Sequence, residues 1–359
     1  KEVIKVVKKS NMSSLNAPEE VYLAEKLIAM HPHFQMVRFA KTGGEANAIA
    51  VRIARAAAKK DKIAICGYHG WHDWYLAANL KSKKNLNNHL LKNLKPNGVP
   101  KNLKNTILTF EYNNINSLKN IIKRNKIGVI KMEVHRNEKP KYGFLKKVRE
   151  IATKNKIVLI FDECTSGFRG AFGGLHKKYK VYPDMCIFGK AIGNGYPITV
   201  VMGKKEIMQK AQDTFISSTF WTDRVGTVAA LKTINEMEKS KSWDKITKTG
   251  RIIKRKWSHL AKKYKLKINI YGLDAIPSFS INSKDWLKYK TYITQEMLLK
   301  NILASNLVFV SISHKENELK KYFKTLEIIF KKISKFEENL DVDKFLNSPV
   351  SHDGFRRLN

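Results

Sequence analysis

Short, nearly continuous apolar runs recur along the first two thirds of the chain. They are rich in β-branched residues and alternate with longer segments of helical periodicity, such as 45–59 and 144–155. Because an unbroken apolar run is typical of a strand covered on both faces, the pattern predicts an α/β fold with a mostly parallel sheet flanked by helices. The expected strands are 62–67, 106–110, 128–132, 157–161, 185–188 and 198–202.

The pattern changes after about Gly226, where a long helical stretch runs through 229–237, with a continuation past Trp243 left open. A smaller α+β region follows, and this change predicts a large domain at 1–240 and a small C-terminal domain at 241–359. Its expected strands are 266–271, 278–281 and 308–312, and its expected helices are 288–301 and 316–336. The Lys- and Asn-rich segment 81–105 is typical of a long surface loop or lid.

Composition places the chain among ordinary globular proteins. Of 359 residues 43% are hydrophobic, which is enough for a sizeable core, and no apolar run is long enough to cross a membrane. No secretory signal is recognisable, although the chain begins at Lys1 and a removed signal stays open. Cys66, Cys164 and Cys186 are scattered without CxxC spacing, so we expect reduced thiols and a cytoplasmic protein.

The net charge of +37 is the unusual feature of the composition, with 68 Lys and Arg against 31 Asp and Glu. Such a balance suits a nucleic-acid partner or an anionic surface. However, the excess is mostly lysine spread along the chain, without a block that combines arginine with stacking aromatics. We therefore favour a solvated lysine surface and expect no nucleic-acid partner.

A glycine turn before the first clear helix is a candidate phosphate site. In the segment 40–47 (AKTGGEAN), Gly43 and Gly44 allow a ligand close to the backbone, and the helix that follows presents unpaired N–H groups. The competing interpretation is a plain helix start, since Thr42 and Glu45 have capping-box spacing. The turn is neither a Walker motif nor GxGxxG.

Aromatic and histidine residues follow the expected strand 62–67, at the kind of strand end where open α/β sheets bind ligands. Tyr68 is suited to stacking on a flat heteroaromatic ring. His69, His72 and Asp73 offer metal-ligand chemistry, but their spacing fits no standard set, so we expect no metal. A packing role for these aromatics also stays open.

Asp162 and Lys190 each lie at the end of an expected strand. Taken singly, Asp162 is also explained as a helix cap or surface acid, and Lys190 as one of many lysines. Together, however, they match the needs of pyridoxal 5′-phosphate (PLP), because a lysine amine forms a Schiff base and a carboxylate keeps the pyridine nitrogen protonated.

With the phosphate turn and Tyr68, these residues resemble class III aminotransferases of the fold type I PLP family, and within it glutamate-1-semialdehyde 2,1-aminomutase and its relatives. Four segments carry the resemblance, which spans nearly the whole chain: 42–46 (TGGEA), 68–70 (YHG), 161–169 (FDECTSGFR) and 189–195 (GKAIGNG).

The resemblance implies the site residues. It implies that the amides of Gly43 and Gly44 bind the cofactor phosphate, that Tyr68 stacks on the ring, that Asp162 pairs with the ring nitrogen and that Lys190 forms the Schiff base. The match also assigns Thr42, His69, Glu133 and Thr165 to the cofactor site. Thr219, in the segment 218–220, matches a threonine that contacts the phosphate of a neighbouring subunit, which implies a homodimer with a shared active site.

Some segments depart from the family pattern. The N-terminal segment that helps to form the family's substrate pocket is mostly absent from the printed chain. Trp221, Thr222, Asp223 and Arg224 replace the usual Ser-Gly-Asn-Pro, and Trp71 and His72 replace small or polar residues. The cofactor contacts are therefore better matched than the substrate contacts.

The resemblance implies PLP-dependent amino transfer between an amino donor and a carbonyl acceptor, through a Schiff base on Lys190. An intramolecular aminomutase uses the same cofactor residues and stays open; the altered aromatic segment favours the transaminase, acting on a sugar or another polar carbonyl compound. The alternative from another class is a basic nucleic-acid-binding protein on a degenerate enzyme scaffold. Retention of both Asp162 and Lys190 argues against it.

Overall fold

The computed structural model describes residues 1–89, 92–135 and 137–352. The chain divides into two compact units, Lys1–Lys241 and Ser242–Asn359. Each has its own apolar core. In the described residues, no helix has both the length and the apolar character that crossing a bilayer requires.

A seven-stranded sheet forms the centre of the first unit, in the order β1-β7-β6-β5-β4-β2-β3. All neighbouring pairs are parallel except those that β7 makes with β6 and β1, which confirms the expected mostly parallel sheet. The strands are β1 Met36–Ala40, β2 Lys62–Cys66, β3 Ile107–Thr109, β4 Ile127–Glu133, β5 Val158–Glu163, β6 Met185–Phe188 and β7 Thr199–Gly203.

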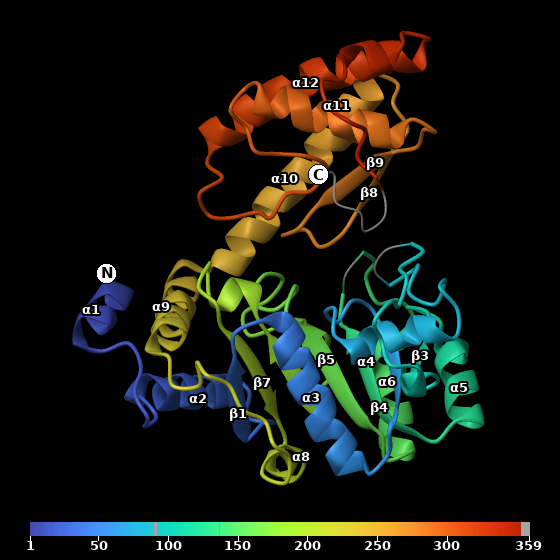
Figure 1. Cartoon of the computed structure of the whole chain (residues 1–359). Helices are drawn as coiled ribbons and strands as arrows, with labels where there is room; N and C mark the ends of the chain where they lie inside the picture. The colour runs from blue at the N-terminus through green and yellow to red at the C-terminus, as the bar shows by residue number, and fades with distance from the viewer. Residues whose placement is uncertain (90–91, 136, 353–359) are drawn as a thin grey trace. The chain divides into compact units, whose positions relative to one another are not determined.

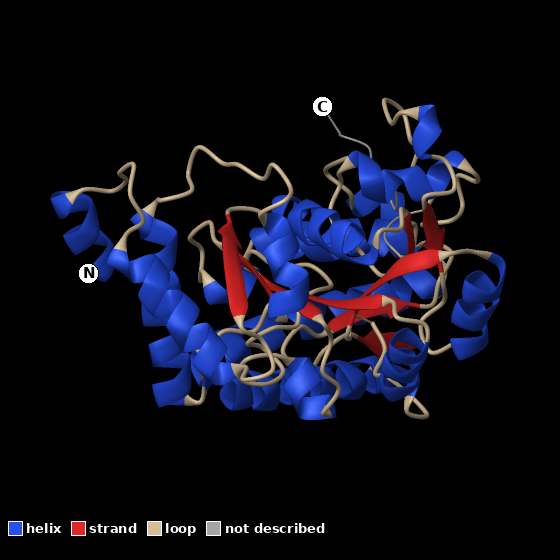
Figure 2. Ribbon diagram, turned by 90° about the horizontal axis from the view of Figure 1, so that it is seen from below, coloured by secondary structure: helices blue, strands red, loops and turns tan. Residues whose placement is uncertain are grey.

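Helices lie on both sides of this sheet (Figure 2). On one face α3 crosses β1, β7, β6, β5 and β4, and its buried alanines let it approach the strands closely (Figure 1). Apolar side chains from α3 and the strands fill the layer between them. The helices of this unit are α1 Glu2–Lys9, α2 Pro18–Met30, α3 Gly43–Ala58, α4 Asp73–Leu76, α5 Ile115–Arg124, α6 Phe144–Lys154, α7 Leu175–Tyr179, α8 Lys205–Met208 and α9 Arg224–Ser240.

The second unit packs three helices around a two-stranded antiparallel sheet, with Trp257, Phe279 and Phe330 in its core. The expectation of a strand at 308–312 is wrong. The segment leading into it makes one isolated bridge, between Leu307 and Ser278, and Pro277 has no N–H group with which to extend a ladder. The elements are α10 Ser242–Lys263, β8 Ile268–Tyr271, β9 Ser278–Ile281, α11 Trp286–Leu298 and α12 Glu316–Glu337.

The segment 81–105 is only partly the surface loop that the composition predicts. Leu86 and Val99 are buried in the same core as α3, and the ring of His89 is buried as well. The Nδ1 atom of His89 accepts a hydrogen bond from the backbone N–H of Gly67 at 3.1 Å. The described part of this segment is therefore anchored to the end of β2.

Candidate active site

The strand directions bring the predicted site residues to one edge of the sheet. Because β1, β2, β4, β5 and β6 all run the same way, their carboxyl ends share that edge. The glycine turn follows β1, Tyr68 follows β2, Glu133 and Asp162 end β4 and β5, and Lys190 follows β6. Since ligands bind in α/β sheets at this edge, we treat it as the candidate active site.

The glycine turn is a helix start of the capping-box type. The hydroxyl of Thr42 accepts the N–H of Glu45, and the Glu45 carboxylate accepts the N–H of Thr42. Gly43 and Gly44 are the first two residues of α3, so their N–H groups have no acceptor inside the helix. The capping role and an anion-binding role are therefore compatible at this turn.

The backbone at Gly70 lies against this turn. Gly70 has a φ of +96°, and a Cβ atom there would lie 3.0 Å from the Cα of Gly44. A Cβ atom on Gly44 would in turn lie 2.9 Å from Cδ2 of His72. The segment that follows β2 and the start of α3 are thus packed backbone to backbone, and neither glycine leaves room for a side chain.

Glu133 holds the backbone next to Tyr68. Its Oε2 accepts the N–H of Tyr68 at 2.9 Å, and its side chain crosses Gly67 so closely that a Cβ atom on that glycine would lie 2.6 Å from Oε2. The Tyr68 ring is half-buried and packs edge-on against Tyr75, with ring centres 6.1 Å apart. Glu133 therefore fixes the path of the chain that carries the predicted stacking residue.

Asp162 is buried and held by several groups at once. Its Oδ1 accepts the N–H of Cys164 at 3.0 Å, and its Oδ2 lies 2.9 Å from Nδ1 of His69. Burial opposes ionisation of Asp162, but the Lys131 ammonium and the His69 hydrogen bond outweigh it and hold the Asp162 pKa below its usual range. The residue is a fixed carboxylate, as pairing with a protonated ring nitrogen requires.

His69 lies behind this carboxylate. Burial lowers the pKa of His69 to about 4, so the ring is neutral at neutral pH and its Nδ1–H donates to Asp162. Its Nε2 atom is buried without a hydrogen-bond partner among the described residues. The geometry gives His69 an orienting contact with Asp162.

Lys190 begins the short 3₁₀ helix η3 (Lys190–Ile192), and its amine is exposed. The Nζ atom donates a hydrogen bond to Oγ1 of Thr165 at 2.7 Å. Gly189 packs against Thr199 and Cys164, where a Cβ atom would lie 3.0 Å and 3.3 Å from their side chains. The base of the lysine is therefore fixed while its amine stays accessible.

Thr219 is the predicted site residue that the structure does not join to the others. It lies in an exposed turn between β7 and α9, and no hydrogen bond of its side chain is found among the described residues. Two of the residues after it that differ from the family pattern, Asp223 and Arg224, have structural partners. Asp223 caps α9 and pairs with Lys41 at 2.6 Å, and Arg224 pairs with Glu19 at 2.6 Å.

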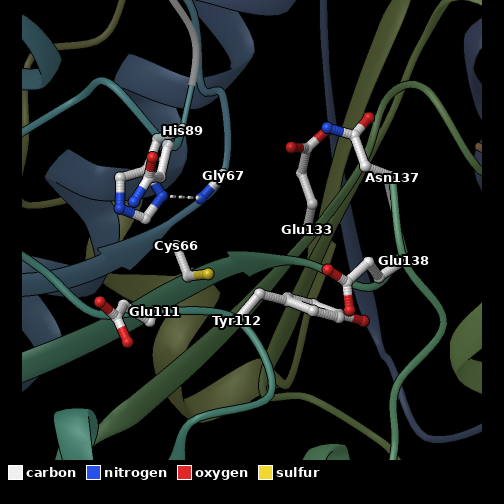
Figure 3. A pocket seen from close by; sticks show the side chains of 9 residues that line it. Cys66, Gly67, His89, Glu111, Tyr112, Glu133, Asn137 and Glu138 are labelled. Atoms are coloured by element: carbon white, nitrogen blue, oxygen red, sulfur yellow. Dashed lines mark hydrogen bonds between the residues drawn. The ribbon is translucent and has the colours of Figure 1, made fainter. Parts of the chain in front are cut away.

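A pocket of about 340 Å³ opens beside Gly67 and Glu133. Sequence reasoning missed most of its lining, which comes from four separate segments and includes the carboxylates of Glu111 and Glu138 (Figure 3). Glu138 is paired with Lys141 at 3.0 Å. The full lining is Cys66, Gly67, Asn88, His89, Glu111, Tyr112, Glu133, Asn137 and Glu138.

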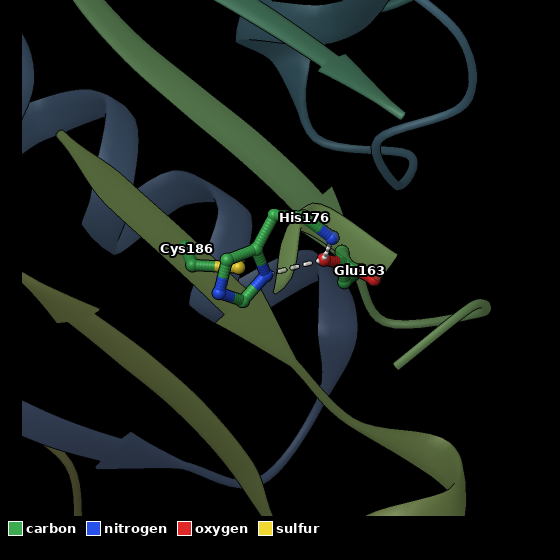
Figure 4. A group of neighbouring side chains, drawn as sticks. All are labelled: Glu163, His176 and Cys186. Atoms are coloured by element: carbon green, nitrogen blue, oxygen red, sulfur yellow. Dashed lines mark hydrogen bonds and ion pairs between the residues drawn. The ribbon is translucent and has the colours of Figure 1, made fainter. Parts of the chain in front are cut away.

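Among the described residues, one group has the proximity of potential metal ligands, namely Glu163, His176 and Cys186 (Figure 4). It does not include the sequence candidates His69, His72 and Asp73. Glu163 accepts the N–H groups of Leu175 and His176 and the Nδ1–H of His176, so it anchors the start of α7. These hydrogen bonds satisfy the buried Glu163 carboxylate without a bound ion.

The donor set at the sheet edge fits a phosphorylated pyridine aldehyde. Free amides at the start of α3 suit a phosphate, the buried Asp162 carboxylate suits a protonated ring nitrogen, and the accessible amine of Lys190 suits an aldehyde. The aromatic ring of Tyr68 lies on the segment between them. These are the chemical groups of PLP.

Comparisons with known proteins agree with this donor set. Among curated proteins, the chain is 36% identical over 291 residues to 3-aminobutyryl-CoA aminotransferase of Cloacimonas acidaminovorans, covering 79% of this chain and 66% of that protein. It is 30% identical over 345 residues to glutamate-1-semialdehyde 2,1-aminomutase of Methanosphaera stadtmanae, covering 88% and 79%.

Solved structures share the fold at low sequence identity. The FumI protein of Sphingopyxis sp. MTA144 matches with a TM-score of 0.84 and 18% identity, over 96% of this chain and 82% of that one. An omega-transaminase from Sphaerobacter thermophilus matches with a TM-score of 0.81 and 21% identity, over 93% and 82%.

The family model described as aminotransferase class-III matches residues 1–306, which is most of the chain. This match confirms the family, the fold type and the cofactor expected from the four sequence segments. The chain belongs to the class III aminotransferases, enzymes that work with PLP.

Proposed function

We propose that this enzyme transfers an amino group from an amino donor to the carbonyl group of a second small molecule. The observation that carries the proposal is the accessible Lys190 amine, held by Thr165 on the same sheet edge as the fixed Asp162 carboxylate. Those two groups serve amino transfer and have no evident use in a purely structural protein.

The residues at the edge divide the task of holding PLP. Gly43 and Gly44 would bind the phosphate through their amides, Tyr68 would face the ring and Asp162 would pair with the ring nitrogen. Lys190 would hold the aldehyde carbon, and Thr165 would steady the lysine. When bound, PLP supplies an electron sink that makes the proton on the substrate's amine-bearing carbon removable.

Lys190 then carries the proton. Its free Nζ would take a proton from the substrate carbon as a general base and would give it back as a general acid. Thr165 Oγ1 accepts a hydrogen bond from Nζ at 2.7 Å, which keeps the free amine close to its working position.

The substrate side favours transfer between two molecules. Trp71 is 72% exposed, and its ring is tilted by 34° against the ring of His72, with centres 4.8 Å apart, next to the phosphate turn. We propose that this exposed indole contacts a polar carbonyl substrate, such as a sugar. The first curated relative is an aminotransferase, while the second is an aminomutase, so intramolecular transfer is the second candidate.

We further propose a homodimer in which Thr219 reaches the cofactor phosphate of the neighbouring subunit. Its exposed turn, without an internal hydrogen-bond partner in the described chain, supports this role. We propose residues 1–240 as the PLP-binding domain and 241–359 as the small domain. The three buried free cysteines support a cytoplasmic location.

The purified protein with added PLP should show a visible absorption band that Lys190→Ala lacks. Mixing the loaded protein with amino acids, diamines or amino sugars should convert the band, and a second carbonyl compound should restore it. Conversion of glutamate-1-semialdehyde without any partner would instead identify an aminomutase. A wild-type protein that stays colourless with PLP would contradict both.

A further inference from the structure

A lysine amine is buried directly under the candidate cofactor site. Lys131 lies in the middle of β4 and has no exposed surface. Its Nζ makes no hydrogen bond to any described residue, and it lies 3.8 Å from Oδ2 of Asp162. Lysines are almost never fully buried unless they are paired, so this position needs an explanation.

The strand pairing explains why the amine points toward the site. Lys131 is in register with Ile160, and Glu133 with Asp162, so Lys131 and Asp162 lie on the same face of neighbouring strands. That face is the one that α3 covers. The amine is therefore enclosed between the sheet and the helix, and the Asp162 carboxylate is its counter-ion.

Two hydrogen bonds and this ion pair account for the environment of Asp162. The Cys164 N–H and the His69 Nδ1–H are neutral donors, whereas Lys131 supplies a positive charge. Burial lowers the pKa of Lys131, and the neighbouring Asp162 carboxylate raises it part of the way back. The titratable groups around the amine are Asp162, Glu133, Cys164, Cys186 and His69.

We propose that Lys131 is a positioning residue that acts through Asp162: it is the counter-ion of this carboxylate before PLP binds, and it weakens the hold of the carboxylate on the protonated ring nitrogen afterwards. The inference rests on the proposed pairing of Asp162 with that nitrogen.

The buried charges around Asp162 differ between the cofactor-free and the PLP-bound protein. Without PLP, Asp162 and Lys131 neutralise each other. With PLP, one carboxylate faces two cations, Lys131 and the ring nitrogen, which repel each other. Replacing Lys131 by an apolar residue leaves the carboxylate unpaired in the cofactor-free protein, a costly state. The ring nitrogen then becomes its only cationic partner, so the cofactor should bind more tightly.

The test compares Lys131→Met with Lys62→Met, each measured with and without PLP. Both changes remove one lysine from the sheet, but Lys62 starts β2 and donates to Asn125 at 2.9 Å, away from Asp162. In Lys131→Met we expect the dissociation constant of PLP to fall roughly tenfold and the cofactor-free protein to melt lower. The pH midpoint of the visible band should also move.

Lys62→Met should change none of these three readouts by a comparable amount. If Lys131→Met shifts the melting temperature equally with and without PLP and leaves the affinity and the band unchanged, Lys131 is a structural residue and the inference is wrong. Lys131→Arg, which keeps a cation, should stay closer to wild type than Lys131→Met. A wild-type protein that binds no PLP would overturn the proposed function and this inference together, whereas a normal wild type with an unresponsive Lys131→Met overturns only the inference.

Discussion

At the scale of single residues, Lys190 has a left-handed backbone, as other lysines of the described chain such as Lys59 and Lys180 also do. Its φ of +45° lies in the left-handed region that glycine adopts easily and that costs a side-chain-bearing residue roughly 1–2 kcal/mol. The strain is local to the residue whose amine meets Thr165. We infer that the turn is kept because it aims Nζ along the sheet edge, and that a relaxed backbone would aim it elsewhere.

Thr165→Val tests whether the hydrogen bond from Lys190 Nζ to Thr165 Oγ1 positions the amine. Valine keeps the shape of threonine but cannot accept the Lys190 Nζ–H, and a hydrogen bond contributes about 0.5–1.5 kcal/mol. We expect the rate of amino transfer to fall by up to about tenfold. Thr165→Ser keeps the hydroxyl and should retain most of the rate; equal rates for both variants would contradict the role.

The site residues that the sequence predicts are those with local signals. Asp162 and Lys190 end or follow apolar strands, and Gly43 and Gly44 precede a clean helix, so each pattern is visible within a few positions. Lys131 has no such signal, because a lysine inside a strand is normally assigned to a solvated face. His89 reaches Gly67 from a polar segment through a contact 22 positions apart in sequence.

At the scale of elements, the close approach of Gly70 to the start of α3 joins two segments of the site. Gly70→Ala would place a methyl group against the Cα of Gly44 in addition to straining the backbone. The contact atom belongs to the backbone, so it cannot be relieved by a side-chain rotation and requires the chain itself to move. We therefore expect the start of α3 to shift and the phosphate contacts to be lost.

Gly98→Ala is the matched control, since Gly98 also has a positive φ, of +83°, but open space around the added atom. Both variants should lose about 1 kcal/mol of stability from backbone strain. Gly70→Ala alone should weaken PLP binding strongly, as measured by titration of the visible band. Equal PLP affinity in both variants would show that the contact with Gly44 does not matter for the site.

The elements that sequence reasoning missed are those that depend on tertiary partners. Strand β1 has Arg38 at its centre and only partly buried residues before Ala40, so its pattern is weak. Its pairing with β7 and the packing of Arg38 over Trp221, 3.9 Å from the ring centre, hold it in place. The prediction of a strand at 308–312 is wrong for the opposite reason. Its apolar pattern is strong, but Pro277 in the neighbouring segment has no N–H group with which to extend the ladder.

At the scale of the whole molecule, the half-buried His33 makes folding stability depend on pH. Burial lowers the pKa of His33 from 6.5 to about 3, and its ring packs against Phe34 and Tyr182. The unfolded chain binds a proton at this position below pH 6.5, whereas the folded chain does so only near pH 3. The contribution of the neutral His33 ring to the free energy of unfolding is therefore fully present above pH 6.5, and it is lost as the pH falls toward 3.

Denaturant unfolding at a series of pH values tests this dependence. We expect wild-type stability to fall between pH 6.5 and 3, and His33→Phe to remove part of the slope because phenylalanine does not titrate. The comparison cancels the repulsion of the +37 surface, which is common to both proteins. Parallel curves for the two proteins would show that His33 has the same pKa in the folded and the unfolded chain, which would contradict the prediction.

The proposed dimer makes a prediction at the same scale. Sedimentation should give twice the chain mass, and Thr219→Val should lower PLP affinity without changing that mass. Mixing Lys190→Ala with Thr219→Val should yield hybrid dimers in which one of the two sites keeps both residues. A monomer with full PLP affinity would contradict the shared site.

The reversal of β7 has a consequence for how this site tolerates change in chain length. Because β7 runs back against β6, residues 189–198 join two neighbouring strands directly, and the connection that carries Lys190 needs no crossover helix. Closing a loop costs free energy that grows only slowly with its length, by roughly 0.6 kcal/mol for a doubling. An inserted residue in the exposed part of this connection, 194–197, should therefore cost little stability. An inserted residue directly after the buried Gly189 would move the amine away from Thr165, so at this connection activity should be most sensitive to chain length beside Lys190.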